Sequence, residues 1–396
     1  MPPEPRPLKL YLVAAEESGD ALGADLARAL RAQHSGAPLT LDGVGGRAMA
    51  AAGIASLFAV DELAIIGIAA IPRRLPMILR RIRETADAVV KARPDALVII
   101  DSPDFTHRVA RRVRARAPSI PIVNYVSPTV WAWRPGRARA MTAYVDQVLA
   151  ILPFEPAAHV KLGGPPCVYV GHPLVERIGE LRPNAEEAER RRKDPPVVLV
   201  LPGSRRSEIR HLAGIFGTAI AQAAARCAME LVLPTPPHLL PLVREAVAGW
   251  AVAPRLVVDP AEKWAAFRRA RAALAASGTV TLELALACVP MVAAYRLSAF
   301  EAFVARLIRL TAGLPSVILA NLVLGENVVP EFIQDDCTPQ HLTDALLPLL
   351  SDTPQRQRQV EAFGRLDGIM AIGSAAPSAK AAAIVLEVAQ RGRPSA

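Results

Sequence analysis

The segment Ala272-Ala-Leu-Ala-Ala-Ser277-Gly-Thr279 has the form of a buried strand that turns directly into a helix. Ser, Gly and Thr are typical residues of such a turn. The first N–H groups of a helix are free and its dipole is positive there, so the turn can bind an anion such as a diphosphate. The segment therefore predicts an α/β fold with a phosphate site at Ser277, Gly278 and Thr279. A turn that is merely capped by the serine or threonine is the alternative.

Glu283 follows Thr279 by four residues and is expected on the same edge of that helix. Its carboxylate can accept hydrogen bonds from two vicinal hydroxyls, as on a ribose. A phosphate site beside a diol acceptor predicts a site for a nucleoside diphosphate.

Strands and helices alternate on both sides of this segment. In the second half we expect strands at Val197–Leu201, Leu231–Leu233, Arg255–Val258 and Met291–Ala294, and a helix at about 208–225. In the first half we expect helices at about 21–33 and 108–117, and strands at Leu8–Ala15, Leu39–Val44, Ala96–Ile100, Ile120–Val126, Val148–Leu152 and Val168–Val170. This alternation predicts doubly wound parallel sheets.

Charge and proline density rise across Arg182–Pro196, which predicts a hinge. We therefore expect two Rossmann-like domains that face a cleft, at residues 1–180 and 181–350. A helical segment and tail follow at 351–396, with a helix at 375–390.

The composition narrows the class of protein. The chain has 396 residues, of which 52% are hydrophobic, and its formal net charge is +9. Such a surplus favours an anionic partner: nucleic acid, a phosphorylated substrate or an acidic membrane surface. The four cysteines and seven histidines are dispersed, so no metal centre, disulfide framework or cofactor is expected and a reducing cytoplasm is favoured. No secretion signal or uninterrupted spanning segment is expected.

A second phosphate turn is predicted where the strand Val197–Leu201 ends, in Pro202-Gly-Ser-Arg205. Gly203 allows close backbone approach, Ser204 offers a hydroxyl, and Arg205 has a guanidinium suited to phosphate oxygens. A purely structural turn, with Glu208 as its cap, is the alternative.

Carboxylates follow two strands of the first half. Asp101 and Asp104 come after Ala96–Ile100, and Glu16, Ser18 and Asp20 come after the first strand, with Gly19 allowing close approach. A carboxylate at the carboxyl edge of a sheet can act as general base towards a substrate hydroxyl. Turn or cap residues are the alternative.

The stretch LAIIGIAAIPRRLPMILRRIR, at Leu63–Arg83, joins apolar residues to paired arginines. Such a pattern can lie on an anionic membrane surface, and a buried helix with a solvated basic face is the alternative. Pro72 and Pro76 are expected to interrupt any long helix. The membrane candidates are Leu63, Ile71, Arg73, Arg74, Leu75, Met77, Leu79, Arg80 and Arg81.

Trp131 and Trp133 share one loop with Arg134 and Arg137. Aromatic faces beside arginines can bind sugar rings, bases or lipid head groups, and tryptophans that anchor the loop in the core are the alternative.

In combination these motifs resemble the lipid-A-disaccharide synthases, glycosyltransferases of the GT-B type. The resemblance covers nearly the whole chain and rests on Ala15–Asp20, Leu63–Gly67, Asp101–Phe105, Tyr125–Arg134, Leu152–Glu155, Gly171-His172, Leu201–Arg205, Ser277–Thr279 with Glu283, Pro290–Val292 with Tyr295-Arg296, and Asn321-Leu322.

The resemblance implies transfer of 2,3-diacylglucosamine from UDP-2,3-diacylglucosamine to the 6-hydroxyl of 2,3-diacylglucosamine 1-phosphate. Lipid A disaccharide 1-phosphate and UDP would be the products, at the cytoplasmic face of the Gram-negative inner membrane. It further implies inversion, with one base on the acceptor oxygen. It also implies that a homodimer can form by exchange of C-terminal segments.

Roles for named residues follow from the motifs and the resemblance together. We expect Asp101 to be the base, with Asp104 and then Glu16 as alternatives, and Ser18, Gly19 and Asp20 at the acceptor sugar. Arg205 and Ser277–Thr279 would neutralise the leaving UDP, and Glu283 would take the ribose hydroxyls. Arg296 would face the uracil, and Asn321 the diphosphate or sugar.

Competing interpretations are another UDP-sugar enzyme on the same fold, such as a UDP-N-acetylglucosamine 2-epimerase or a peptidoglycan-type transferase, and a nucleic-acid-binding protein. The first would not need an apolar basic patch. The second would show salt-dependent affinity for oligonucleotides, but the sequence contains no recognition motif for them, so no nucleic-acid partner is expected.

Overall fold

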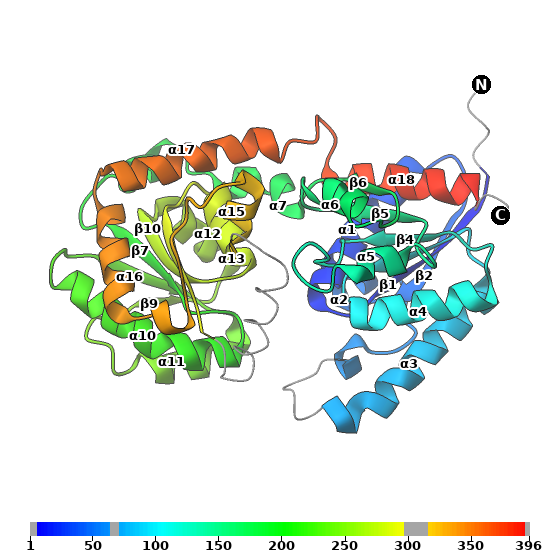
Figure 1. The fold of residues 1–396 in the computed structure, drawn as a ribbon, viewed down its shortest axis with the longest axis horizontal. Helices are drawn as coiled ribbons and strands as arrows, with labels where there is room; N and C mark the ends of the chain where they lie inside the picture. The colour runs from blue at the N-terminus through cyan, green and yellow to red at the C-terminus, as the bar shows by residue number, and fades with distance from the viewer. Residues whose placement is uncertain (1–5, 64–70, 297–315, 393–396) are drawn as a thin grey trace. The chain divides into compact units, whose positions relative to one another are not determined.

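The protein is described here by a computed structural model that covers residues 6–63, 71–296 and 316–392 (Figure 1). The chain divides into two compact units. Unit 1 consists of Met1–Pro173 and Ile372–Ala396, and unit 2 consists of Leu174–Ala371.

Unit 1 is built on a six-stranded parallel sheet in the order β2-β1-β3-β4-β5-β6. Its strands are β1 (Leu8–Ala14), β2 (Leu39–Val44), β3 (Ala96–Ile100), β4 (Ile122–Tyr125), β5 (Gln147–Ala150) and β6 (Cys167–Tyr169). All five residues of β3 are buried, as expected of an apolar strand covered on both faces.

Helices cover both faces of this sheet. They are α1 (Glu17–Gln33), α2 (Arg47–Ala51), α3 (Ile71–Ala92), α4 (Pro103–Arg116), α5 (Gly136–Met141), α6 (Glu155–Lys161) and α18 (Pro377–Arg391), with the 3-10 helix η1 (Val60–Leu63). The C-terminal helix α18 lies beside α1 (Figure 1), and both bury apolar side chains in one core cluster. Helices α3 and α4 cover the opposite face.

Unit 2 repeats this plan with a six-stranded parallel sheet in the order β12-β11-β10-β7-β8-β9. Its strands are β7 (Val197–Leu201), β8 (Glu230–Pro234), β9 (Arg255–Val257), β10 (Ala272–Ala276), β11 (Met291–Tyr295) and β12 (Glu331–Ile333). The expected fold class, α/β with two doubly wound parallel sheets, is confirmed.

The helices of unit 2 follow the same alternation. They are α8 (Ile178–Leu181), α9 (Ala185–Arg190), α10 (Arg206–Ala224), α11 (Leu240–Val247), α12 (Pro260–Arg269), α13 (Thr279–Leu286), α15 (Leu319–Leu324), α16 (Pro339–Leu346) and α17 (Pro354–Ile369), with short 3-10 turns η3 (Pro237–Leu239), η4 (Gln334–Asp336) and η5 (Leu347–Leu350). Helix α7 (Pro173–Glu176) stands at the boundary between the units.

Two sequence expectations about helices were wrong. Helix α3 is continuous through Pro76, although prolines were expected to interrupt it. Pro76 lies in the second turn, so the helix loses a hydrogen bond only near its start. Helices α1 and α4 begin at Glu17 and Pro103, several residues earlier than predicted, because they start almost directly after the preceding strands.

Candidate functional site

The carboxyl edge of the unit 1 sheet has a topological switch point between β1 and β3. The chain continues from β1 to β2 on one side, whereas β3 and the later strands lie on the other side. Ligands of open α/β sheets bind in the crevice at such a point. The residues that follow β1 and β3 are Glu16–Asp20 and Asp101–Asp104, so the sheet brings these two predicted clusters together.

Asp101 is fixed by hydrogen bonds on both its backbone and its side chain. Its N–H donates to the carbonyl of Tyr125 (3.0 Å), and its own carbonyl accepts from Thr106 Oγ1 (2.7 Å). Oδ1 accepts from the N–H of Ser102 (2.8 Å), and Oδ2 accepts from Ser18 Oγ (2.8 Å). The carboxylate is therefore held at the edge of the sheet with a defined orientation.

The backbone is strained at Asp101 and Ser102. Asp101 and Ser102 have φ angles of 54° and 44°, in the left-handed region. Non-glycine residues there cost of order 1–3 kcal/mol each and are found where surrounding contacts impose them, often at functional sites. Gly19 permits the arrangement, because a Cβ on this residue would stand 3.1 Å from the Ile100 carbonyl oxygen.

The alternative bases are less constrained than Asp101. Asp104 lies in the first turn of α4, its side chain is 85% exposed, and it stands 3.5 Å from Arg137 Nη2. Glu16 is exposed at the start of α1, and its side chain makes no capping hydrogen bond. Among the three predicted bases, only Asp101 is both anchored and close to a second strand end.

Asp20 has a different environment from the one predicted. Its buried carboxylate accepts hydrogen bonds from the N–H groups of Gly46 (2.7 Å), Ala48 (2.8 Å) and Met49 (3.0 Å). These are the first amides of α2, so Asp20 caps that helix from α1. The structure therefore favours a structural role for Asp20 over contact with a sugar.

A buried histidine, which the sequence did not single out, supports the start of the next loop. His107 Nε2 lies 3.0 Å from Asn124 Oδ1, and its Nδ1 lies 3.0 Å from the Tyr144 hydroxyl. Asn124 Nδ2 in turn donates to the carbonyl of Val126 (2.9 Å). Burial lowers the pKa of His107 to about 4, so the imidazole is neutral at pH 7.

Unit 2 has its own switch point, between β7 and β10. Leu201 pairs with Ala275, and Ala276 pairs with Ala294 of the next strand. The predicted turns 202–205 and 277–279 therefore lie at neighbouring strand ends, and Arg296 follows the end of β11. The sheet thus brings together the two turns that the sequence assigned to phosphate.

The turn 202–205 is organised by Glu208. Its Oε2 accepts from the N–H groups of Ser204 (2.8 Å) and Arg205 (3.1 Å), and its Oε1 lies 3.1 Å from Arg205 Nη1. Gly203 has φ 124°, and a Cβ there would collide with the Glu208 side chain. The carboxylate thus accepts from two amides of the turn that the sequence assigned to a phosphate, while the Arg205 side chain remains 75% exposed.

The helix amides at the turn 277–279 meet no side-chain acceptor among the residues that the structure describes. Helix α13 begins at Thr279, and its N-cap residue is Gly278, which has no side chain to cap it. Ser277 is half-buried, Gly278 and Thr279 are exposed, and the hydroxyl of Thr281 donates to the Gly278 carbonyl (2.7 Å). The alternative of a turn capped by Ser277 or Thr279 is therefore not found, and these amides can bind an anion.

Glu283 has a partner that the sequence did not reveal. Its Oε2 lies 2.8 Å from Nζ of Lys263 in α12, and both side chains are partly buried. The Lys263 ammonium also stands 4.1 Å from the centroid of the Trp264 ring. Lys263 and Glu283 are 20 residues apart on different helices, so no local spacing could indicate the pair.

The two remaining candidates for nucleotide binding, Arg296 and Asn321, differ in burial. Arg296 is exposed at the end of β11. Asn321 is buried, and its amide donates to Ser316 Oγ (3.2 Å) and to the Val329 carbonyl (3.0 Å). Its oxygen accepts from the N–H groups of Val328 (3.0 Å) and Val329 (2.9 Å). These contacts use every hydrogen-bonding position of the amide, so the structure favours a structural role for Asn321.

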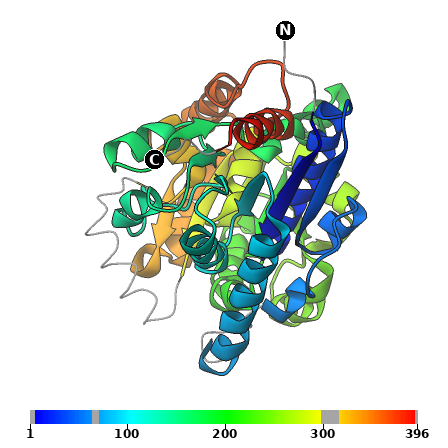
Figure 2. The same cartoon turned by 90° about the vertical axis from the view of Figure 1, so that its right-hand side faces the viewer.

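The predicted membrane patch is only partly exposed. The amino-terminal half of α3 extends away from the sheet of unit 1 (Figures 1 and 2), and the Leu75 side chain there is 42% exposed. Met77 is half-buried, whereas Leu63 and Leu79 pack against the core.

The arginines of the predicted membrane patch differ in their ion pairs and burial. Arg80 pairs with Glu84 (2.7 Å), and Arg81 pairs with Glu62 (2.6 Å) and Glu84 (2.7 Å). Arg74 is half-buried, while residues 64–70 and the side chains of Ile71 and Arg73 lie outside the described part. No helix in the described ranges is both long and apolar enough to cross a bilayer.

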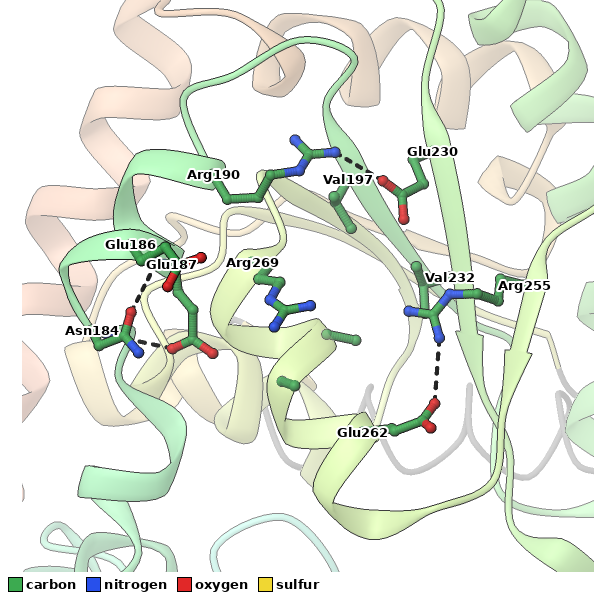
Figure 3. A pocket seen from close by; sticks show the side chains of 12 residues that line it. Asn184, Glu186, Glu187, Arg190, Val197, Glu230, Val232, Arg255, Glu262 and Arg269 are labelled. Carbon is green, nitrogen blue, oxygen red and sulfur yellow. Dashed lines mark hydrogen bonds and ion pairs between the residues drawn. The ribbon is translucent and has the colours of Figure 1, made fainter.

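A pocket of about 620 Å³ lies elsewhere in unit 2, between α9, α12 and the amino-terminal ends of β7, β8 and β9 (Figure 3). Four of its charged residues form two ion pairs: Arg190 with Glu230 (2.8 Å) and Arg255 with Glu262 (3.4 Å). The pocket is far along the strands from their carboxyl ends, so we assign it no part in the site.

Comparison with known proteins identifies the family. A model of the lipid-A-disaccharide synthetase family matches residues 10–383. Lipid-A-disaccharide synthase of Bradyrhizobium diazoefficiens is 62% identical over 387 residues, which cover 97% of each chain. The enzyme of the same name from Rhodospirillum centenum is 43% identical over 391 residues, covering 97% of this chain and 95% of its own. The chain belongs to the lipid-A-disaccharide synthetase family.

Membership makes the protein a glycosyltransferase of lipid A biosynthesis, as the resemblance predicted. The family covers both units and all the motifs discussed above, because the match extends from β1 into α18. A nucleic-acid-binding protein and an epimerase are therefore not retained as interpretations.

Solved structures share the fold at low sequence identity. A UDP-N-acetylglucosamine 2-epimerase from Listeria monocytogenes superposes with a TM-score of 0.61 at 13% identity, covering 96% of this chain and 95% of its own. MurG of Acinetobacter baumannii gives 0.54 at 15% identity, with 97% and 100% covered. A co-structure of MnaA with UDP from S. aureus gives 0.60 at 12% identity, with 98% and 96% covered. These likenesses establish the GT-B type of fold.

Proposed function

We propose that this member of the family transfers 2,3-diacylglucosamine from UDP-2,3-diacylglucosamine to the 6-hydroxyl of 2,3-diacylglucosamine 1-phosphate, with inversion. The products are lipid A disaccharide 1-phosphate and UDP. The observation that carries the proposal is the anchored carboxylate of Asp101 at the switch point of unit 1, in a chain of this family.

In this proposal Asp101 is the general base. The acceptor 6-hydroxyl gives its proton to the Asp101 carboxylate as its oxygen forms a bond to C1 of the donor sugar. The bond from C1 to the β-phosphate oxygen breaks, and its electron pair leaves with UDP. One anchored carboxylate is sufficient for such a single displacement. The hydrogen bonds from Ser18 and Ser102 hold the carboxylate in one orientation towards the acceptor.

Unit 2 binds the uridine nucleotide in this proposal. The amides at the start of α13 and the exposed Arg205 guanidinium hold the diphosphate and stabilise its charge as the bond breaks. Glu283 accepts hydrogen bonds from the ribose hydroxyls through Oε1, because Oε2 is paired with Lys263. Arg296 lies at the adjoining strand end and faces the uracil.

Both substrates are acylated, so we also propose peripheral contact with the anionic cytoplasmic face of the inner membrane. The extended amino-terminal half of α3, with Leu75 and Met77, is the surface for it, since Leu79, Arg80 and Arg81 are engaged elsewhere. An apolar side chain on such a surface can insert at the level of the head groups. A homodimer formed by exchange of C-terminal segments remains part of the proposal, and its test is the mass of the protein in solution.

Incubation of purified protein with both substrates, followed by mass spectrometry, tests the reaction. A disaccharide 1-phosphate formed in equal amount to UDP is the expected result. An anomeric NMR coupling that corresponds to the β linkage is expected for inversion. Release of UDP from the donor without disaccharide would reject the proposed acceptor.

A further inference from the structure

The loop of residues 127–134, which joins β4 to α5, forms hydrogen bonds with side chains of α6. The indole N–H of Trp131 donates to Glu155 Oε1 (3.2 Å), and the N–H of Leu152 donates to Glu155 Oε2 (3.0 Å). The Trp131 ring also packs edge-on against Phe154, with centroids 5.1 Å apart. Glu155 is 1% exposed, so its carboxyl group serves contacts inside the protein only.

A second hydrogen bond ties the same loop to the same helix. Ser127 Oγ lies 2.9 Å from Nε2 of His159, and both side chains are buried. Glu155 and His159 are one turn apart on α6, so they present their polar atoms along one side of the helix. The loop is thus fixed at its first residue and at its central tryptophan.

The loop starts and ends beside the candidate bases. Ile100 pairs with Tyr125 across the sheet, and the N–H of Asp101 donates to the Tyr125 carbonyl (3.0 Å). Beyond the loop, Arg137 of α5 stands 3.5 Å from Asp104. The surface of loop 127–134 therefore adjoins the carboxyl edge of the unit 1 sheet, where Asp101 would meet the acceptor.

The side chains on the loop suit a phosphorylated sugar. Trp131 and Trp133 are half-buried, and Arg134 is exposed with its guanidinium 5.0 Å from the Trp133 ring. An indole presents an apolar face to a sugar ring, and a guanidinium binds phosphate oxygens in a bidentate manner. The loop offers both beside the carboxylate that would receive the acceptor proton.

Packing alone does not require a carboxyl group at residue 155. Burying one is costly, and an apolar side chain of similar volume fills a core position equally well or better. Burial raises the pKa of Glu155 to about 7, although the hydrogen bonds from Trp131 and from the backbone lower this pKa. Its oxygens are what the Trp131 indole and the Leu152 amide require, so its role is to place these groups.

We propose that Glu155 is a positioning residue that, through the Trp131 indole, fixes loop 127–134 as the wall of the acceptor sugar-phosphate site. This inference rests on the proposed function. Glu155 does not touch the substrate; it acts by holding the tryptophan. The loop then presents Trp131, Trp133 and Arg134 in one arrangement.

A double-mutant cycle tests this role. Glu155→Met removes the acceptor and Trp131→Phe removes the donor of the contact, and loss of a partner for a buried polar group predicts a rise of about tenfold in the acceptor KM. Because both variants break the same contact, the double variant is expected to be no worse than the single ones. The affinity for UDP, measured by calorimetry, is expected to stay unchanged.

Asp146→Asn is the matched control. Asp146 pairs with Arg114 at the start of β5, so the variant loses a structural ion pair of the same unit at the other end of the sheet. It is expected to lower Tm without changing the acceptor KM. If Glu155→Met behaves in the same way, the role of Glu155 is structural and the proposal is overturned. Additive effects in the cycle would likewise show that Glu155 does not act through Trp131.

Hydrogen exchange separates this inference from the proposed function. Without any substrate, residues 127–134 of Glu155→Met are expected to exchange faster than in the wild-type protein, while unit 2 is unaffected. Trp131→Phe is expected to give the same pattern, which keeps the test available if Glu155→Met fails to fold. Unchanged exchange in the loop overturns the positioning role. If the variants exchange as expected but the wild-type protein makes no disaccharide, the proposed function and the acceptor wall are overturned. The contact between Glu155 and Trp131 then still stands.

Discussion

The hydroxyl of Ser18 donates a hydrogen bond of 2.8 Å to Oδ2 of Asp101, although the two residues are 83 positions apart. The bond joins the first turn of α1 to the residue after β3, at the switch point of the unit 1 sheet. The N–H group of Ser102 donates a hydrogen bond to the other carboxylate oxygen, Oδ1. This geometry distinguishes Asp101 from the other carboxylates nearby and is the basis for its proposed role as general base.

Asp101→Asn is expected to reduce the rate of disaccharide formation by at least two orders of magnitude, because the amide cannot accept the acceptor proton. Binding of UDP, which we assign to unit 2, is expected to persist in calorimetry. Asp104→Asn and Glu16→Gln serve as controls and are expected to retain most of the rate. Near-normal turnover by Asp101→Asn would transfer the role to one of these two residues.

Glu283→Gln is expected to weaken UDP binding by roughly tenfold or more, the scale for hydrogen bonds to a charged group. Binding of inorganic pyrophosphate is expected to be unaffected, since it has no ribose. Lys263→Met leaves the Glu283 carboxylate in place and is expected to have a smaller effect on UDP. Equal losses for UDP and pyrophosphate in Glu283→Gln would contradict a ribose contact.

The pH dependence of stability is expected to reveal His107. Burial lowers the pKa of His107 in the folded protein to about 4, below its ordinary value of 6.5. The contribution of the neutral imidazole to stability is therefore fully present above about pH 6.5 and is lost as the pH falls through 4. The free energy of unfolding of the wild-type protein relative to His107→Gln is expected to decrease by about 3 kcal/mol over this range.

Thermal unfolding of the two proteins across a pH series measures this difference, in which contributions of the carboxylates common to both cancel. His172, whose burial also lowers its pKa to about 4, is present in both proteins and cancels too. Parallel pH profiles would show that His107 is not buried as a neutral group.

Membrane contact through α3 is tested by Leu75→Ser together with Met77→Ser. Removal of these apolar side chains is expected to shift the protein from vesicles that contain anionic lipid to the supernatant. Leu79 is excluded from the test because it packs against the core, and its replacement would also lower stability. Ala50→Ser in α2, another exposed position of unit 1, is the control. Unchanged sedimentation would place the contact elsewhere.

Most of the fold could be predicted from the sequence because buried parallel strands are short apolar runs. Ala96–Ile100, Val197–Leu201 and Ala272–Ala276 were predicted with the bounds that the structure has. The starts of α1 and α4 could not, since Glu16 and Ser102 precede these helices without capping them through their side chains.

The grouping of the candidate site residues at strand ends could be predicted in part for a related reason. Polar turns after apolar strands are visible in the sequence, so Asp101 and the two turns of unit 2 could be found. Ser18, the partner of Asp101, and Lys263, the partner of Glu283, come from other parts of the chain, and no local pattern indicates these pairs. The same limit applies to Asn321, whose motif was visible but whose hydrogen bonds to Ser316 and Val329 were not.

The central claim is that the chain joins two acylated glucosamine units with release of UDP. The most direct measurement is mass spectrometry of the products formed by the wild-type protein from UDP-2,3-diacylglucosamine and 2,3-diacylglucosamine 1-phosphate. The account predicts one disaccharide 1-phosphate for each UDP released, and its near-complete loss with Asp101→Asn. A wild-type protein that leaves both substrates unchanged, or that releases UDP without joining the sugars, would contradict it.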